Sequence, residues 1–320
     1  MSTTLRDPAF RSYAAQFEEV VGRAPRLALL VETDAHEGPV YFADENALYF
    51  TTLPRPGVGG APSVLIKRVG LDQPEQVSVV GGEANAANGM APDLEGGLLV
   101  CEQGSRAQHA RISRLDRLTG ERESVVDQWR GLRFNSPNDV VCASDSSIWF
   151  TDPSYGHLQG FKPGPMVGDF VYRYDPRTEQ VEVVADSFDK PNGLAFSPDE
   201  RVLYVTDTGA NQQPGSYHVD RPHHIKAFDV VDGRSLAGER LLAVTTPGFP
   251  DGLKVDRGEA STPPRSPASK FTTPGACRSA RSASLEPSTS ASAAPRATCC
   301  SSPPTLRSGS LNWPRRERDS

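Results

Sequence analysis

The sequence predicts an all-β protein of the β-propeller type, and three features of the chain point to this fold class. Polar residues followed by Gly or Asp recur about every 50 to 60 residues. Each precedes a short segment rich in β-branched and aromatic residues, and a second such segment begins about a dozen residues later. Two further segments complete each repeat, and four short strands per repeat favour a propeller over a sandwich or single barrel. The repeated polar residues are Glu37, Asn88, Asn138, Asn192 and Asp251.

The first half of each repeat is predicted to form an inner hairpin, and the second half an outer hairpin. Asp, Ser, Gly and Pro separate the apolar segments, as expected at tight turns. The predicted inner hairpins pair residues 38–42 with 48–51, 89–91 with 98–101, 140–142 with 148–151, and 193–196 with 202–206. The predicted outer hairpins pair residues 64–66 with 77–80, 110–112 with 124–126, 170–172 with 181–184, and 224–226 with 241–243.

The repeat pattern divides the chain into three parts. Residues 1–29 form a polar N-terminal segment with an amphipathic, helical pattern, and residues 30–257 form the propeller. A fifth inner hairpin begins at Asp251, but the pattern stops at Gly258, so the ring is expected to be incomplete, with about four and a half blades. Residues 258–320 contain 14 Ser and 9 Pro and no Val, Ile or Tyr, a composition that predicts disorder. Because the break falls inside a hairpin, we interpret this tail as an out-of-frame reading; a natural low-complexity tail is the alternative.

Charge and hydropathy narrow the class of function. The chain has a net charge of −6, and the acidic residues are concentrated in the repeats, whereas the tail is basic. This distribution argues against nucleic acid as a partner. No apolar run is long enough to cross a membrane, and the N-terminus lacks the basic start and apolar core of a signal peptide. We therefore expect a cytoplasmic protein with no membrane partner.

The repeated polar residues predict a cation site. One carboxylate or carboxamide per repeat, at one register, is expected to converge on the central channel of a propeller. A group of oxygen ligands suits a hard cation such as calcium. The alternative is that these Asn and Asp residues only make turns.

Several ordered motifs give the repeats a family resemblance. Residues 134–141 (FNSPNDVV) and 147–156 (SIWFTDPSYG) strongly resemble the gluconolactonase branch of the senescence-marker-protein (regucalcin-like) family. Residues 37–39 (EGP), 88–90 (NGM), 190–199 (KPNGLAFSPD) and 250–253 (PDGL) fit the same pattern. The resemblance covers about residues 30–257 and implies a six-bladed propeller with one catalytic divalent cation in its channel.

The resemblance also implies roles for individual residues. The metal ligands fall on Glu37, Asn138, Asn192 and Asp251, and the general base on Asp251. Asn88 occupies the remaining register position and is expected to line the substrate pocket. Calcium is the first choice of cation, with zinc, magnesium and manganese as alternatives. The missing C-terminal third departs from the family pattern and puts ring closure in doubt.

These residues predict a metal-dependent lactonase, a carboxylic ester hydrolase that opens a sugar lactone or a similar small molecule. The cation polarises the lactone carbonyl and an activated water attacks it. Long connections at residues 153–169 and 208–223 are candidates for substrate specificity, and Tyr155 and His157 in the first are expected to contact substrate. The alternatives are a phosphotriesterase-like hydrolase on the same scaffold and an inactive calcium-binding or interaction propeller.

Overall fold

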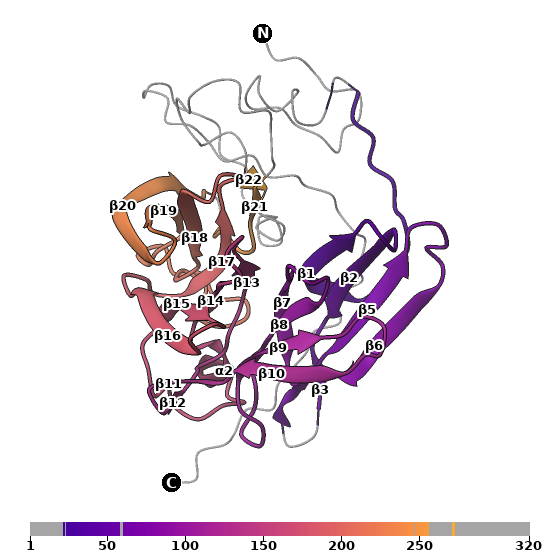
Figure 1. Ribbon diagram of the computed structural model, residues 1–320, viewed down its shortest axis with the longest axis horizontal. Coiled ribbons are helices and arrows are strands. Elements are labelled where there is room, and N and C mark those ends of the chain that lie inside the picture. Colours follow the sequence, from indigo (N-terminus) through magenta and orange to yellow (C-terminus); the bar gives the residue numbers. More distant parts are fainter. Residues whose placement is uncertain (1–21, 23, 58–59, 247, 256–270, 273–320) are drawn as a thin grey trace.

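Four antiparallel sheets of four strands each follow one another along the chain (Figure 1). The computed structural model describes residues 22, 24–57, 60–246, 248–255 and 271–272. Within each sheet the strands pair in sequence order, so each is a meander. The predicted all-β architecture and the alternation of inner and outer hairpins are therefore confirmed.

The strand bounds agree with the predicted hairpins within a few residues. The first sheet consists of β1 (Ala35–Phe42), β2 (Ala47–Thr52), β5 (Leu65–Gly70) and β6 (Val77–Glu83). The second consists of β7 (Ala87–Pro92), β8 (Leu98–Glu102), β9 (Arg111–Leu115) and β10 (Arg122–Val126). The third consists of β13 (Val140–Cys142), β14 (Ile148–Asp152), β15 (Phe170–Asp175) and β16 (Gln180–Ala185). The fourth consists of β17 (Pro191–Phe196), β18 (Val202–Asp207), β19 (His224–Val231) and β20 (Ser235–Val244).

Short elements lie in the connections. The strand pairs are β3 (Arg55–Pro56) with β4 (Pro62–Ser63), β11 (Gln128–Trp129) with β12 (Leu132–Arg133), and β21 (Lys254–Val255) with β22 (Phe271–Thr272). The predicted long connection at 153–169 contains the helical turn α2 (Tyr155–Leu158), which the sequence analysis did not anticipate.

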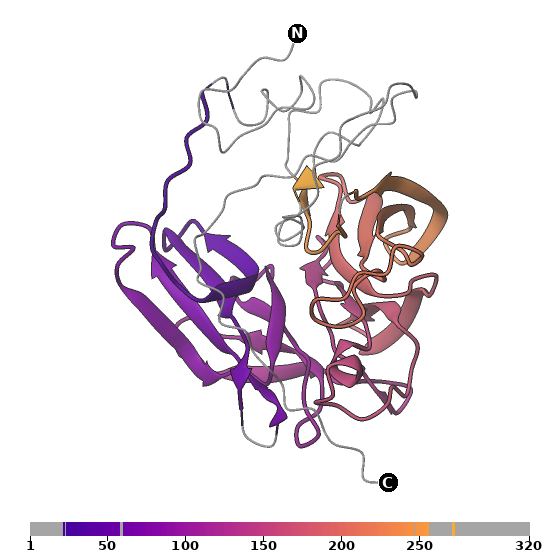
Figure 2. The ribbon, with the colours of Figure 1, turned by 180° about the vertical axis from the view of Figure 1, so that it is seen from behind.

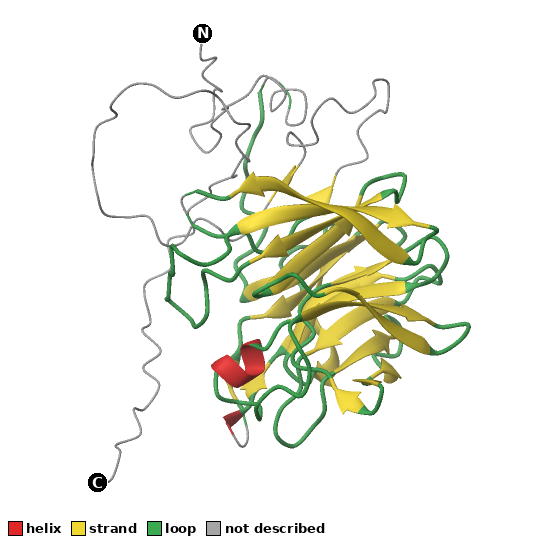
Figure 3. Ribbon diagram, turned by 90° about the vertical axis from the view of Figure 1, so that its left-hand side faces the viewer, coloured by secondary structure: helices red, strands yellow, loops and turns green. Residues whose placement is uncertain are grey.

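The first strand of each sheet lies toward the centre of the molecule, and the last strand lies outermost (Figure 1). Strands β1, β7, β13 and β17 are successive neighbours, and β21 lies beside β17. The view from behind shows the same arc, and the side view shows the sheets as successive layers (Figures 2 and 3). Among the described residues, no strand pairing joins the fourth sheet back to the first. The number of blades and the incompleteness of the ring remain predictions.

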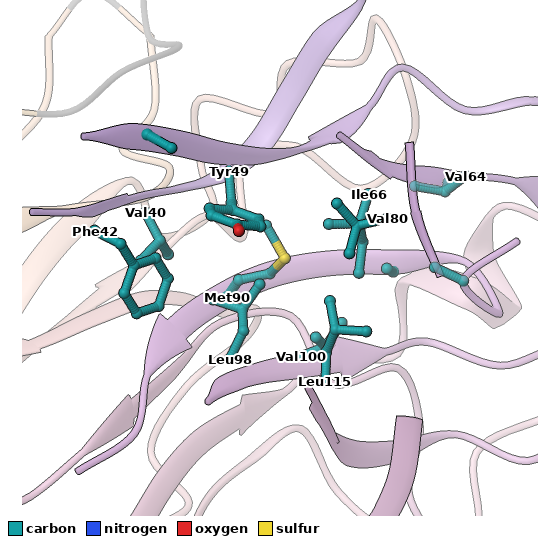
Figure 4. Close-up of a cluster of buried hydrophobic side chains, with 13 residues drawn as sticks. Val40, Phe42, Tyr49, Val64, Ile66, Val80, Met90, Leu98, Val100 and Leu115 are labelled. Carbon is teal, nitrogen blue, oxygen red and sulfur yellow. The ribbon is translucent and has the colours of Figure 1, made fainter. Parts of the chain in front are cut away.

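Alternating side chains hold neighbouring sheets together. Successive residues of a strand point to opposite faces of the sheet, so one strand contributes side chains to the hydrophobic core on each side. In β8, Leu98 and Val100 pack against the first sheet, whereas Leu99 and Cys101 pack against the third. Figure 4 shows the first of these cores, in which Met90 lies beside Tyr49. A third cluster joins the third and fourth sheets, and a fourth places Leu253 against the fourth sheet.

The turn after the first strand of each sheet has one residue in the left-handed region. Its φ is +45° at Asn46, +86° at Gly96, +70° at Ser146 and +55° at Glu200. Only glycine adopts this conformation without a steric cost. The repeat is therefore preserved in backbone geometry even where its turn sequence varies.

The two ends of the chain lie largely outside the described residues. The predicted helical pattern in residues 1–29 falls mostly there, and so does most of the predicted disordered tail. The exception is β22, where Phe271 pairs with Val255 and Thr272 with Lys254. Such a pairing of two residues needs only backbone groups. The predicted disorder of the rest of the tail lies outside the described residues and stays a prediction.

Candidate active site at the centre of the arc

The five repeated polar residues, called the register residues below, all lie on or next to the inner strands, which are the first strands of the sheets. Glu37 is in β1, Asn88 in β7 and Asn192 in β17, while Asn138 precedes β13 and Asp251 precedes β21. Asn138 and Asn192 are buried. Glu37, Asn88 and Asp251 are half-buried and keep a path to solvent. The sequence pattern thus places all five at the central edge of their sheets.

Irregular pairing sets the direction of three of these residues. The ladder register shifts between Glu37 and Val40, between Ala87 and Met90, and between Pro191 and Leu194. Such bulges bend a strand and redirect its side chains, and they are frequent beside active sites. Glu37, Asn88 and Asn192 lie at these shifts, where the regular pairing of the strands is interrupted.

The glycine after each of these residues allows the next inner strand to approach. A Cβ on Gly38 would lie 2.8 Å from the Asn88 carbonyl oxygen, and one on Gly89 would lie 2.4 Å from that of Asn138. A Cβ on Gly193 would lie 2.6 Å from the Asp251 carbonyl oxygen. The repeated polar–Gly pair therefore has two functions: the first residue supplies a polar group, and the second removes a steric barrier.

Three carboxylates influence one another across the central space. Burial raises the pKa of Glu37 well above its ordinary value, and the charges of Asp251 and Asp139 raise it further. Burial also raises the pKa of Asp251 to about 6, although a hydrogen bond from Asn192 opposes this effect. Glu37 comes from the first sheet and Asp251 from the segment after the fourth, so charges from both ends of the arc act on one another here.

Asp139 and Lys254 belong to this group, and the sequence analysis did not select them as site residues. Asp139 is buried, and its carboxylate accepts hydrogen bonds from the backbone N–H of Val140 at 2.9 Å and of Leu194 at 3.4 Å. It thereby bridges the third and fourth sheets where the other repeats have glycine. Burial raises the pKa of Asp139, whereas the charge of Lys254 lowers it. Lys254 also lowers the pKa of Glu37 and so offsets part of the negative charge.

Tyr155 reaches the group from α2, whereas His157 does not. The Tyr155 side chain is buried, and burial and the charge of Asp251 raise the pKa of its phenol well above the ordinary value. Asn192 and Thr208 are polar neighbours that oppose this shift. The hydroxyl has no partner with hydrogen-bond geometry in the described part of the chain. His157 is exposed, and its predicted contact with substrate stays a prediction.

A buried lysine anchors the loop that carries Tyr155. Lys162 Nζ donates to the carbonyl oxygens of Gln103 at 2.8 Å and Phe134 at 3.2 Å, and also to that of Asn135. Burial lowers its pKa to about 8. These bonds tie the loop that carries Tyr155 to the segments that follow β8 and precede β13. A lone lysine in a glycine-rich loop gives no sequence signal for this role.

In the third and fourth sheets, the second strand ends with an aspartate whose carboxylate binds backbone N–H groups just before the register residue. Asp152 accepts from the N–H groups of Asn135 at 2.8 Å and Ser136 at 2.7 Å. Asp207 accepts from those of Asp189 and Lys190, both at 3.0 Å. Their carboxylates are occupied by backbone N–H groups, which gives them a structural role.

The donor set at the centre fits a hard cation. Within the described ranges, no group of three or more His, Cys, Asp or Glu has the arrangement of a metal site. The predicted ligands are instead two carboxylates and two carboxamides, which are oxygen donors of the kind that calcium prefers. Burial and neighbouring negative charge raise the pKa of Glu37 and of Asp251, so a positive charge nearby would favour the charged form of both. A buried, unpaired amide oxygen on Asn88 adds an acceptor on the neighbouring inner strand.

Comparison with known proteins identifies the family. Residues 35–261 match the sequence profile of the SMP-30/Gluconolactonase/LRE-like region, which is most of the chain. The chain belongs to this family. Within the described residues, no helix has the length and apolar character needed to span a bilayer.

Two similar proteins align with most of this chain. It is 30% identical to the lactonohydrolase oryL of Aspergillus oryzae over 74% of this chain and 58% of that protein. It is 30% identical to a gluconolactonase of Zymomonas mobilis over 69% of this chain and 62% of that protein. The chain thus spans about three-fifths of the length of these two relatives.

Solved structures support the fold. A gluconolactonase from Xanthomonas campestris matches with a TM-score of 0.62 at 33% identity, covering 77% of this chain and 74% of that one. The calcium-binding protein regucalcin of Agrobacterium tumefaciens matches with a TM-score of 0.51 at 14% identity, covering 71% of this chain and 66% of that one. The second likeness concerns the fold alone.

Proposed function

We propose that this protein is a divalent-cation-dependent lactonase that opens a sugar lactone or a similar small lactone. The observation that carries the proposal is the set of mutually repelling carboxylates, Glu37, Asp139 and Asp251, at the centre of a gluconolactonase-family fold. Glu37, Asn138, Asn192 and Asp251 would hold the cation, with calcium as the first choice. When bound, the cation polarises the lactone carbonyl and stabilises the charge that develops on its oxygen.

The chain's own residues then have separate tasks. Asp251, whose pKa is near 6, takes a proton from the attacking water and acts as general base. The water oxygen forms a bond to the carbonyl carbon, and the bond from that carbon to the ring oxygen breaks. The ring oxygen takes up the proton that Asp251 removed from the water and leaves as a hydroxyl. The product is a hydroxy acid, whose carboxyl group releases a proton to the solvent at neutral pH.

Two further side chains would bind and orient the substrate. The buried amide oxygen of the half-buried Asn88 has no hydrogen-bond partner within the described residues and can accept a hydrogen bond from a substrate hydroxyl. Tyr155 keeps its proton because its pKa is raised, so its hydroxyl can donate to a substrate oxygen. Both groups favour a lactone with several hydroxyls.

The test is a panel of lactones and one phosphotriester, assayed by proton release before and after chelation. We expect lactone opening that EDTA abolishes and added Ca²⁺ restores. Glu37→Gln should weaken Ca²⁺ binding and lower the activity, whereas Glu75→Gln, the same change at an exposed position, should affect neither. Lactone opening that is unchanged after full removal of divalent cations would contradict the proposal, and turnover of the phosphotriester alone would favour the phosphotriesterase alternative.

A further inference from the structure

A threonine recurs at the same position of the second strand in three of the four sheets. Thr51, Thr151 and Thr206 are each the second-last residue of β2, β14 and β18. All three side chains are completely buried. In the first sheet, Thr51 pairs with Glu37, the register residue of the same sheet.

Each of these hydroxyls contacts the register residue of the next sheet along the chain. Thr51 Oγ1 lies 3.2 Å from the Asn88 carbonyl oxygen and 3.1 Å from that of Glu37 in its own sheet. Thr151 Oγ1 lies 2.6 Å from the Asn192 carbonyl oxygen, and Thr206 Oγ1 lies 2.9 Å from that of Asp251. The contacted carbonyl groups therefore belong to register residues.

The direction of the bonds is clear at the last two threonines. A hydroxyl donates one proton, and Thr151 Oγ1 lies 3.5 Å from the Asp139 carbonyl but only 2.6 Å from that of Asn192. Thr206 Oγ1 likewise lies 3.4 Å from the Gly193 carbonyl and 2.9 Å from that of Asp251. Each oxygen also accepts from its own sheet, from Asp139 N–H at 3.1 Å and Gly193 N–H at 2.8 Å. The hydroxyl thus joins one inner strand to the next.

The second sheet lacks this hydroxyl. Cys101 occupies the corresponding position of β8 and is buried, with its thiol free. The Asn138 carbonyl accepts instead from the backbone N–H of Gly89 at 2.7 Å. This sheet therefore uses a backbone bond where its neighbours use a side chain.

We propose that Thr151 and Thr206 are positioning residues that fix the backbone of Asn192 and Asp251 and so set where these side chains lie in the site. In the second sheet, Cys101 stands where the other sheets have this threonine, so the hydroxyl bond to the next inner strand is absent there. The inference deepens the proposed function and rests on it, because Asn192 and Asp251 are proposed there as ligands. Displacing such groups by about 1 Å can lower a rate by a factor on the order of 100.

The decisive variant is Thr206→Val, which keeps the shape of the side chain but removes the hydroxyl that reaches Asp251. Thr52→Val is the matched control: Thr52 is also buried and accepts from the Leu65 N–H at 3.0 Å, with no bond to a register residue. Thr206→Ser keeps the hydroxyl and serves as the rescue variant. Calorimetric titration with CaCl₂ alone, kcat and KM on the best lactone, and thermal unfolding are measured for each protein.

We expect Thr206→Val to lower Ca²⁺ affinity and kcat by about tenfold each while KM changes little, because the reacting groups are displaced. Thr206→Ser should restore both. Thr52→Val should lower the thermal midpoint without changing Ca²⁺ affinity or kcat. Equal effects of Thr206→Val and Thr52→Val on all readouts would overturn the proposal, because they would show a structural role only.

Two further measurements keep the test independent of folding and of activity. If Thr206→Val does not fold, Cys101→Ser is the second variant, because it introduces the missing hydroxyl into the second sheet. Unchanged or higher Ca²⁺ affinity supports the positioning role of the hydroxyl, and a lower Ca²⁺ affinity overturns it. If the native protein binds no Ca²⁺ and opens no lactone, the proposed function fails. Crystal structures then decide the positioning claim, because Thr206→Val must shift the Asp251 backbone and Thr52→Val must leave it in place.

Discussion

Negative charges in a buried site repel one another, and Glu37 and Asp251 show this effect. The pKa of each is raised by burial and by neighbouring negative charge, and Lys254 compensates only in part. Groups in this state gain most when a cation binds, since binding favours the charged form. The same repulsion makes their charges unfavourable for folding, so function and stability oppose each other at these residues.

This conflict leads to the first prediction, for Asp251→Asn. Loss of the general base should lower kcat by a factor of about 1,000. Stability at pH 7 should stay equal or rise, because the folded protein disfavours the charged form of this residue. Proton-release kinetics and urea unfolding measure the two effects. Asp220→Asn, at an exposed position, is the control, and full lactonase activity in Asp251→Asn would remove this residue from the role of base.

Asp175 has the opposite electrostatic character and leads to a prediction about acid stability. Hydrogen bonds from Arg177, together with those from the buried Arg173, hold its pKa below the ordinary value of 3.8. A carboxylate with a lowered folded-state pKa contributes stability above its unfolded pKa and loses that contribution as the pH falls. Native stability should therefore drop as the pH is lowered from about 5 to about 3.

The variant Asp175→Asn tests this assignment. It should lower the free energy of unfolding by about 3 kcal/mol at pH 7, because it leaves the Arg173 guanidinium buried with a weaker partner. At pH 3 the difference from the native protein should be smaller. Urea unfolding at both pH values measures it, and a deficit that is equal at pH 7 and pH 3 would show that charge is not the cause.

At the scale of elements, much of the fold was predictable from the sequence because strands and turns have local signals. The segment 98–101 alternates between two cores, and it is β8 in the structure. The polar–Gly pairs predicted the inner strands correctly. What the sequence did not show is why glycine is needed there, since the close approach involves a strand about 50 residues away. Asp139, Lys162 and the threonine hydroxyls were missed for the same reason: their partners lie in other sheets.

Two glycines of the same motif provide an internal comparison at this scale. A Cβ on Gly193 would lie 2.6 Å from the Asp251 carbonyl oxygen, whereas one on Gly252 would meet no described atom within 4 Å. Gly193→Ala should therefore destabilise the protein by about 1–3 kcal/mol and weaken cation binding, because it forces β17 and the Asp251 segment apart. Gly252→Ala should have little effect on either. Thermal unfolding with and without Ca²⁺ measures both, and equal losses in the two variants would contradict the close-approach explanation.

At the scale of the whole molecule, the site depends on both ends of the arc. Glu37 belongs to the first sheet, and Asp251 and Lys254 follow the fourth, yet their charges interact. A cation held by these residues would link ends that no strand pairing joins among the described residues. Binding to the folded state alone would then stabilise the arc as a whole. The excess of acidic residues in the repeat region agrees with such a site.

The most direct test of this account is an anomalous difference map from a crystal of the native protein soaked with Mn²⁺, with a Ca²⁺ soak for ligand distances. We predict one strong peak at the centre of the arc, bounded by side-chain oxygens of Glu37, Asn138, Asn192 and Asp251, with Ca²⁺–oxygen distances of about 2.3–2.6 Å. A well-ordered crystal with no peak between these four side chains, or with its only peak elsewhere, would contradict the central claim that they form one cation site.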